Sequence, residues 1–259
     1  MKITVATVFH NEIEFLPKWY ESVKTYADEI ILAAHAPVDG SLEWAKQKQQ
    51  DNEIPIQIVE FPKDTIYKHG FCHMKNIIAA KATGDWIVSL DADEEMDMTK
   101  DTLKPFTQDR SVCVSTMTMH MTERRDHWTL DNREIIKQEA NWINQRHWRI
   151  YRNGLGIEWI GLIHEELRLP NGIHVARFSR TSPIRMWHYG SMANPSKRGF
   201  KDGLYAELLL RVVEQPELRA GTSKWWYTEY FDQNKEKLYK DREEYRKVIP
   251  TLFENAQTA

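Results

Sequence analysis

Two aspartates, Asp91 and Asp93, stand one residue apart directly after an apolar run at residues 86–90. The run has the composition of a buried strand, so both carboxylates can reach into a cleft where the backbone turns at the strand's end. Carboxylate oxygens suit Mg²⁺ or Mn²⁺, ions that keep coordination positions for phosphate oxygens and water. Acidic triplets are common in turns, and the position after a strand is what makes this one informative. The pattern predicts a metal site at Asp91 and Asp93.

One histidine is a candidate third ligand of this metal. His188 ends another β-like run and is followed by Tyr189 and Gly190. A neutral imidazole can complete the coordination shell of Mn²⁺. A histidine beside aromatic residues is also common as a half-buried side chain with ordinary hydrogen bonds. The sequence leaves both interpretations open.

The residues before Asp91 alternate between strand and helix patterns. Runs of β-branched and apolar residues predict strands at residues 2–9, 29–34, 56–59 and 85–90. Apolar residues at helical spacing predict helices at residues 16–26, from Leu42 with Ser41 as its cap, and at 74–82. This alternation implies βαβ units and a parallel sheet, with ligands beyond the carboxyl ends of the strands. Both His10-Asn11-Glu12 and Asp91-Ala92-Asp93 fall at those ends.

The pattern changes after residue 111. A strand-like run at residues 112–119 and further short β signals to about Gly190 predict a mixed or antiparallel extension of the sheet. From Pro195 the chain has helical periodicity again, including the segment 225–248.

Composition excludes several classes of protein. The 259 residues carry a net charge of −3, which argues against binding to nucleic acid. The apolar run at residues 3–9 is too short for a signal peptide or a membrane span, so a cytoplasmic location is expected. Five of the ten tryptophans lie between Arg124 and Tyr189. Their rings suit carbohydrate stacking, although each one taken singly is more often part of a core.

Five segments of the first half resemble, in order and spacing, the inverting family-two glycosyltransferases of the GT-A fold. They are residues 7–12, 27–31, 39–41, 75–76 and 83–94. The resemblance implies a Rossmann-like α/β fold with a mixed, mainly parallel sheet flanked by helices. It divides residues 1–190, the catalytic domain, into a nucleotide-sugar half at 1–100 and an acceptor half at 101–190. Residues 191–259 would form a helical C-terminal extension.

The resemblance also implies roles for individual residues. His10, Glu12, Asp39 and Lys75 would lie at the nucleotide. Asp91 would face the ribose, while Asp93 would hold the Mn²⁺ or Mg²⁺ that bridges the diphosphate of a UDP- or GDP-linked sugar. One departure from the family pattern is Ala34, which stands where the family has an aspartate for the base or ribose. The identity of the nucleotide is therefore open, and Asp39 could equally be a turn residue.

The second half contains Trp159-Ile160-Gly161-Leu162-Ile163-His164-Glu165-Glu166. This segment resembles the His-Glu element of the subset related to lipopolysaccharide-core transferases. Inverting transfer needs a carboxylate that takes the proton of the acceptor hydroxyl. Glu165 is the candidate base and Glu166 the next, unless the His-Glu pair is structural. Lys75 and three arginines, Arg146, Arg149 and Arg152, are candidates for stabilising the departing diphosphate, or are solvated surface charges.

The expected function is transfer of a hexose-type sugar to a hydroxyl group on a glycan, lipid or protein, as in the synthesis of cell-surface polysaccharide. One alternative is nucleotidyl transfer, but the loop after the first strand, residues 10–14, is acidic and lacks the glycines that grip a triphosphate. Another is a non-catalytic binding module on a degenerate fold. Two adjacent carboxylates argue against it, because they repel unless they serve a cation. The C-terminal helices resemble a single tetratricopeptide-type pair, which must dock on the catalytic domain, a second subunit or a membrane surface.

Overall fold

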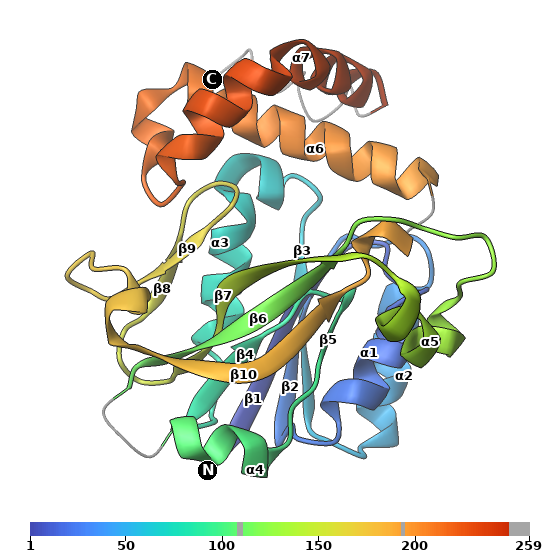
Figure 1. Cartoon of the computed structure of the whole chain (residues 1–259), viewed down its shortest axis with the longest axis vertical. Coiled ribbons are helices and arrows are strands. Elements are labelled where there is room, and N and C mark those ends of the chain that lie inside the picture. Colours follow the sequence, from blue (N-terminus) through green and yellow to red (C-terminus); the bar gives the residue numbers. More distant parts are fainter. Residues whose placement is uncertain (108–110, 193–194, 249–259) are drawn as a thin grey trace. The chain divides into compact units, whose positions relative to one another are not determined.

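The computed structural model describes residues 1–107, 111–192 and 195–248 (Figure 1). The chain forms two compact units. The first contains Met1–Lys63, Met74–Glu158 and Leu167–Met192, and the second contains Asp64–His73, Trp159–Glu166 and the chain from residue 193 onward.

The first unit is built on an eight-stranded sheet in the order β3-β2-β1-β4-β7-β6-β10-β5. Its first half is parallel and comprises β1 (Ile3–Phe9), β2 (Glu29–His35), β3 (Ile56–Phe61) and β4 (Trp86–Ser89). The helices α1 (Leu16–Val23), α2 (Ser41–Asp51) and α3 (Thr65–Ala79) connect these strands. The four strands expected from the apolar runs are confirmed.

The second half of the sheet is mixed. β7 (Trp142–Arg152) runs antiparallel to both β4 and β6 (Cys113–Met121), and β10 (Ser179–His188) runs parallel to β6. The three-residue strand β5 (Glu94–Met96) closes the edge antiparallel to β10. The expected mixed extension is thus confirmed, and β5 returns the chain that carries Asp91 and Asp93 to the far edge of the same sheet (Figure 1).

Shorter elements complete the first unit and its borders. They are α4 (Lys100–Leu103), η1 (Lys104–Phe106), η2 (Leu130–Asn132), α5 (Arg133–Glu139), η3 (Val175–Phe178), η4 (Gly190–Met192), and β8 (Glu158–Ile160) paired with β9 (Glu166–Arg168).

The core explains why these segments fold as they do. On α1, the apolar side chains Leu16, Trp19, Tyr20 and Val23 recur at helical spacing, and all four are buried against the sheet. The strands β1 and β4 are buried on both faces, which accounts for their continuous apolar runs. Of the five tryptophans between Arg124 and Tyr189, three are buried and two are half-buried, so they pack rather than present open faces.

The second unit is mainly helical. It contains α6 (Pro195–Glu214), η5 (Pro216–Arg219), the π-helical turn η6 (Trp226–Tyr230) and α7 (Phe231–Val248). Arg246 on α7 donates two hydrogen bonds, of 2.7 and 3.0 Å, to the fully buried carboxylate of Glu207 on α6. The expected helical C-terminal segment is confirmed. Within the described residues, no helix is both long and apolar enough to cross a membrane.

Several helix boundaries differ from the sequence-based expectation; α1, for example, ends at Val23 instead of residue 26. Ser41 is the first residue of α2 and not its cap, because Gly40 occupies the cap position with a φ of 91°. α3 begins at Thr65 instead of residue 74 and ends at Ala79 instead of 82. The helix is kinked at Gly70, whose φ is 74° and where a Cβ atom would lie 2.4 Å from the carbonyl oxygen of Leu162. Because of this kink, the first turns of α3 do not continue the regular helical periodicity of the residues that follow.

Candidate active site

The acidic segment Asp91-Ala92-Asp93 links β4 to β5 as a tight turn. The Glu94 N–H donates to the carbonyl of Asp91 at 3.0 Å, and the Asp91 N–H donates to Glu94 Oε2 at 2.8 Å. This closure sends the two aspartates to different environments. The side chain of Asp91 is 38% exposed, while that of Asp93 is only 7% exposed.

Two cations from other elements meet the acidic turn. Arg149 Nη2 lies 2.9 Å from both Asp91 Oδ2 and Glu94 Oε1. The nearly buried Lys75 places its Nζ 3.7 Å from Asp91 Oδ1. Because Val88 of β4 pairs with Ile150 of β7, the preceding residue Arg149 reaches the carboxyl end of β4. The local balance is three carboxylates, including Asp93, against two cations.

The three arginines singled out in the sequence are therefore separated by the structure. Arg149 contacts the acidic turn, whereas Arg146 donates to the carbonyl of Ser182 at 3.3 Å. Arg152 donates to the carbonyls of Ser111 and Thr107. Glu94 is an addition to the predicted set: burial raises the pKa of its carboxyl despite the charge of Arg149, and the carboxylates of Asp91 and Asp93 push the pKa in the same direction.

Asp93 and His188 lie side by side, with Asp93 Oδ2 3.5 Å from His188 Nε2. Strand pairing produces this contact, because β5 and β10 place Glu94 opposite His188. The Tyr189 N–H also donates to the carbonyl of Asp93 at 2.8 Å. Gly190 keeps the two side chains accessible to each other: a Cβ there would lie 2.9 Å from the His188 ring and 3.2 Å from Asp93 Oδ2.

These atoms fit a divalent cation in their chemistry. A carboxylate oxygen and an imidazole nitrogen are suitable ligands for Mn²⁺, and the net negative balance of the turn favours a cation. Within the described residues, no three side chains of His, Cys, Asp or Glu converge as a complete shell. The protein ligands here would therefore be few, as is usual for ions that keep water and substrate phosphates in their shell.

A second layer of histidines, not predicted from the sequence, supports His188. His120 Nδ1 lies 3.1 Å from His188 Nδ1, and the ring of His147 is 5.4 Å from that of His120. Burial lowers the pKa of His120 to about 4 and that of His147 to about 3, so both are neutral at pH 7. A neutral partner on Nδ1 orients the His188 ring with its Nε2 toward Asp93. The sequence does contain a signal for this contact, because His120 directly follows the predicted strand at residues 112–119.

The predicted nucleotide end is a set of interlocked loops after β1 and β2. His10 Nδ1 lies 2.6 Å from the carbonyl of His35, the residue after Ala34, and His35 Nε2 lies 3.0 Å from the carbonyl of Lys63. The N–H of Glu12 donates to Ser41 Oγ at 2.9 Å. Ala34, which stands where the family pattern has an aspartate, is buried, and the residue after it, His35, joins the two loops.

Asp39 ties the same two loops together. Its carboxylate accepts hydrogen bonds from the N–H of Ile13, the N–H of Ser41 and the hydroxyl of Ser41, at 3.0, 3.0 and 2.5 Å. Burial alone would raise the pKa of Asp39, but these hydrogen bonds hold the pKa below its ordinary value. The carboxylate is thereby engaged in holding the turn, which is the structural role that the sequence left open.

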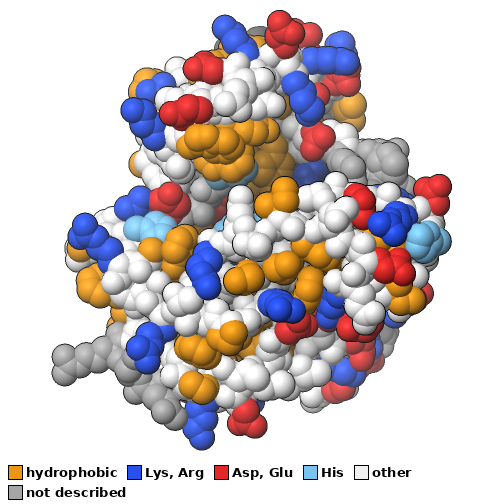
Figure 2. Space-filling view, in the orientation of Figure 1, with side chains coloured by type: hydrophobic (Ala, Val, Ile, Leu, Met, Phe, Trp, Pro, Cys, Tyr) orange, Lys and Arg blue, Asp and Glu red, His pale blue; other side chains and the backbone are white. Residues whose placement is uncertain are grey.

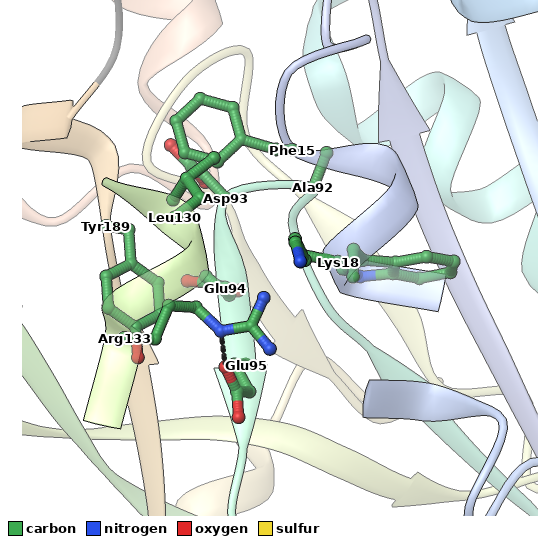
Figure 3. Close-up of a pocket in the computed structure, with 10 residues that line it drawn as sticks. Phe15, Lys18, Ala92, Asp93, Glu94, Glu95, Leu130, Arg133 and Tyr189 are labelled. Atoms are coloured by element: carbon green, nitrogen blue, oxygen red, sulfur yellow. Dashed lines mark ion pairs between the residues drawn. The ribbon is translucent and has the colours of Figure 1, made fainter. Parts of the chain in front are cut away.

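A small pocket lies beside Asp93 (Figure 3). It is lined by Phe15, Lys18, Trp19, Ala92, Asp93, Glu94, Glu95, Leu130, Arg133 and Tyr189. Arg133 reaches across it from α5 to Glu95, with 2.8 Å between Nε and Oε2. The indole N–H of Trp19 and the hydroxyl of Tyr189 are buried with no hydrogen-bond partner among the described residues. Two residues that line the pocket thus carry buried polar groups without a partner among the described residues.

The candidate base belongs to the second unit. Glu165 is half-buried and forms an isolated antiparallel bridge with Thr222, and Glu166 begins β9. His164 has a left-handed φ of 52°. Its ring stacks on Trp226 with centroids 3.5 Å apart.

Residues 4–162 match the model of Glycosyl transferase family 2. The chain belongs to this family. The match covers β1 to β4, the acidic turn, Arg149 and the start of the His-Glu segment. The mixed eight-stranded sheet with flanking helices is the GT-A fold. No curated protein sequence matches the chain.

Solved structures of two other proteins are similar to this chain at low identity. S. aureus TarS 1-349 in complex with UDP is 12% identical, with a TM-score of 0.42 over 81% of this chain and 66% of that chain. The same protein in complex with UDP-GlcNAc is 14% identical, with a TM-score of 0.41 over 81% and 67%. Glucosyl-3-phosphoglycerate synthase from Mycobacterium tuberculosis, in complex with Mn²⁺, UDP and phosphoglyceric acid, is 14% identical, with a TM-score of 0.33 over 46% and 42%. The chain thus spans about two thirds of the TarS fragment bound to UDP.

Proposed function

We propose that the chain transfers a sugar from a nucleoside-diphosphate sugar to a hydroxyl group of a glycan, lipid or protein, with inversion at the anomeric carbon. The observation that carries this proposal is the pairing of Asp93 with His188, 3.5 Å apart, beside the Arg149–Asp91 ion pair. Family membership supports the reaction class. UDP, named in the TarS complexes, is the first nucleotide to test.

In this proposal Asp93 Oδ2 and His188 Nε2 would hold a Mn²⁺ or Mg²⁺ ion. The ion, when bound, neutralises negative charge that develops on the departing diphosphate. His120 orients the ring of His188, and Gly190 leaves the space that both side chains need.

Lys75 and Arg149 would interact directly with the phosphates of the donor. Arg149 and Lys75 are already held at the acidic turn by Asp91, so little reorganisation precedes donor binding. Asp91, the more exposed aspartate of the pair, can accept a hydrogen bond from a ribose hydroxyl when the donor arrives. His10 and Glu12 line the nucleotide end.

Glu165 takes the proton of the acceptor hydroxyl as that oxygen attacks the anomeric carbon from the face opposite the diphosphate. General base catalysis typically contributes a factor of about 10² to 10⁴. Glu166 is the alternative base, and the matching variants Glu165→Gln and Glu166→Gln decide between them. Glu165→Gln is expected to lower turnover at least about 100-fold while leaving donor binding intact. Unchanged turnover in this variant would remove Glu165 from the role.

Donor binding is tested by thermal unfolding with UDP and MnCl₂, alone and together. The pair is expected to raise the melting temperature, and Asp93→Asn is expected to abolish that rise. Asp126→Asn, which changes an exposed aspartate of the same unit, is the matched control and should respond like the wild type. If UDP, GDP and other nucleoside diphosphates leave the melting temperature unchanged with either metal, the donor site is refuted.

A further inference from the structure

An aromatic side chain of the second unit is open to solvent although its neighbours are ordered around it. Trp225 is 46% exposed. Among the described residues of this unit, Val248 is the only other exposed large hydrophobic side chain. Figure 2 shows hydrophobic side chains gathered on the visible face of the C-terminal helical part, bordered by charged residues. We call Trp225, Trp226 and Tyr230 the aromatic platform.

The platform is rigidly built. The ring of Trp225 lies 4.8 Å from that of Trp226 at 72°, and 5.3 Å from that of Tyr230 at 52°. Trp226 in turn stacks on His164, with 3.5 Å between centroids and only 4° between ring planes. One face of Trp226 is therefore covered, and its role is to support Trp225. The edge-to-face contact with Trp226 and the tilted contact with Tyr230 restrict the indole of Trp225, so that binding costs little further conformational entropy.

The segment that carries Trp225 is bound to the segment that carries the candidate base, Glu165. Thr222, three residues before Trp225, donates its hydroxyl to the carbonyl of Ile163 at 3.0 Å and bridges to Glu165. Gly221 packs so closely that a Cβ would lie 2.3 Å from the carbonyl carbon of Ile160. The segments carrying Glu165 and Trp225 are thus fastened to each other by backbone contacts.

Two local departures from regular backbone occur at this place. His164 has a φ of 52°, which a side chain with a Cβ adopts at a cost. Trp226–Tyr230 forms a π-helical turn, a rare conformation that is frequent at functional sites. Burial lowers the pKa of His164 to about 4, so the stack on Trp226 is between neutral rings at pH 7. The two unusual backbone conformations thus lie on either side of the stack between His164 and Trp226. Their cost indicates that this arrangement has a functional role.

We infer that the aromatic platform binds a sugar ring of the acceptor, and hence that the acceptor is a saccharide; this rests on the proposed function. A single fixed indole face matches the flat C–H face of one pyranose, whose hydroxyl groups then meet polar neighbours. Exposed Lys224 and Glu229 flank the platform and provide a donor and an acceptor. A lipid surface would need a wider apolar area with several inserted side chains, and one exposed tryptophan does not provide it.

The test uses the full chain without nucleotide on a printed array of oligosaccharides of glucose, galactose, rhamnose and N-acetylhexosamines. The wild type is expected to bind at least one glycan. By titration with that glycan, Trp225→Ala should bind about tenfold or more weakly, and Trp225→Phe should retain most of the affinity. Phe178→Ala is the matched control, since Phe178 is 48% exposed in the first unit, and it should bind like the wild type.

The inference is overturned by a blank array, or by Trp225→Ala binding as tightly as the wild type. Loss of binding to anionic lipid vesicles in Trp225→Ala, with a blank array, would assign the platform to membranes instead. Melting temperatures of the variants establish that they fold. Failure of the proposed function is seen separately: Asp93→Asn, which removes a proposed metal ligand of the first unit, should bind the glycan normally in this assay without donor or metal.

Discussion

Arg149 lies 2.9 Å from Glu94, whose side chain is only 2% exposed. Burial raises the pKa of the Glu94 carboxyl, and the charge of the Arg149 guanidinium opposes that rise. The same nitrogen also contacts Asp91, so one side chain holds the acidic turn closed. The stability of the turn and the proposed binding of the donor therefore depend on the same arginine.

Replacing Arg149 with methionine is expected to lower the free energy of unfolding by about 3–5 kcal/mol, since it leaves a buried charge without its partner. The double variant Arg149→Met/Glu94→Gln should recover much of that loss. Urea unfolding at pH 7 measures both. Arg146→Met, which removes an exposed arginine, should change stability by about 0.5 kcal/mol or less. A double variant as unstable as Arg149→Met would show that the pairing with Glu94 is not what matters.

Gly190→Ala is expected to abolish the stabilisation by UDP and Mn²⁺ and to lower turnover about 100-fold. The reason is steric, because the new Cβ would lie 2.9 Å from His188 and 3.2 Å from Asp93 Oδ2, and one of them must move. The thermal shift with and without ligands measures the effect. Gly199→Ala is the control, since nothing lies within 4 Å of its added Cβ. A normal ligand-dependent shift in Gly190→Ala would contradict a metal site at Asp93 and His188.

The sequence was sufficient where the determining signal is local. Asp91 and Asp93 follow an apolar run, and the structure places them directly after β4. What the sequence could not select was Arg149 among three similar arginines, because that choice depends on Val88 pairing with Ile150 across the sheet. His120 beside His188 was likewise missed, since their pairing joins β6 to a parallel strand 68 residues later. Register between distant strands leaves no trace in a single sequence.

A pH dependence is expected from Glu29 at the end of the sheet opposite the acidic turn. Burial alone would raise its pKa, but hydrogen bonds from Thr4, Thr83 and Lys2 lower the pKa to about 2, from an ordinary value of 4.5. A lowered pKa in the folded state stabilises the protein above pH 4.5, and this contribution is lost as the pH falls toward 2. Glu29→Gln should therefore be less stable by about 2 kcal/mol at pH 7, with the difference shrinking below pH 4.5.

Urea unfolding of the wild type and Glu29→Gln at pH 7, 5 and 3 checks this expectation. Glu43→Gln, which changes an exposed glutamate on α2, is the control and should differ from the wild type by a small amount at pH 7. A difference between Glu29→Gln and the wild type that is the same at pH 7 and pH 3 would mean that the charge of Glu29 contributes nothing.

Gly221 and Gly172 have nearly identical φ angles, of 76° and 77°, but opposite surroundings. A Cβ at Gly172 meets nothing within 4 Å, whereas one at Gly221 would lie 2.3 Å from Ile160. Alanine at either position costs about 1–2 kcal/mol for the left-handed conformation, and only Gly221→Ala adds overpacking of about 1–3 kcal/mol. Because that strain falls on the backbone fastening Glu165 to Thr222, Gly221→Ala should also lower turnover. Equal melting temperatures and equal turnover for the two variants would show that this contact does not position Glu165, the proposed base.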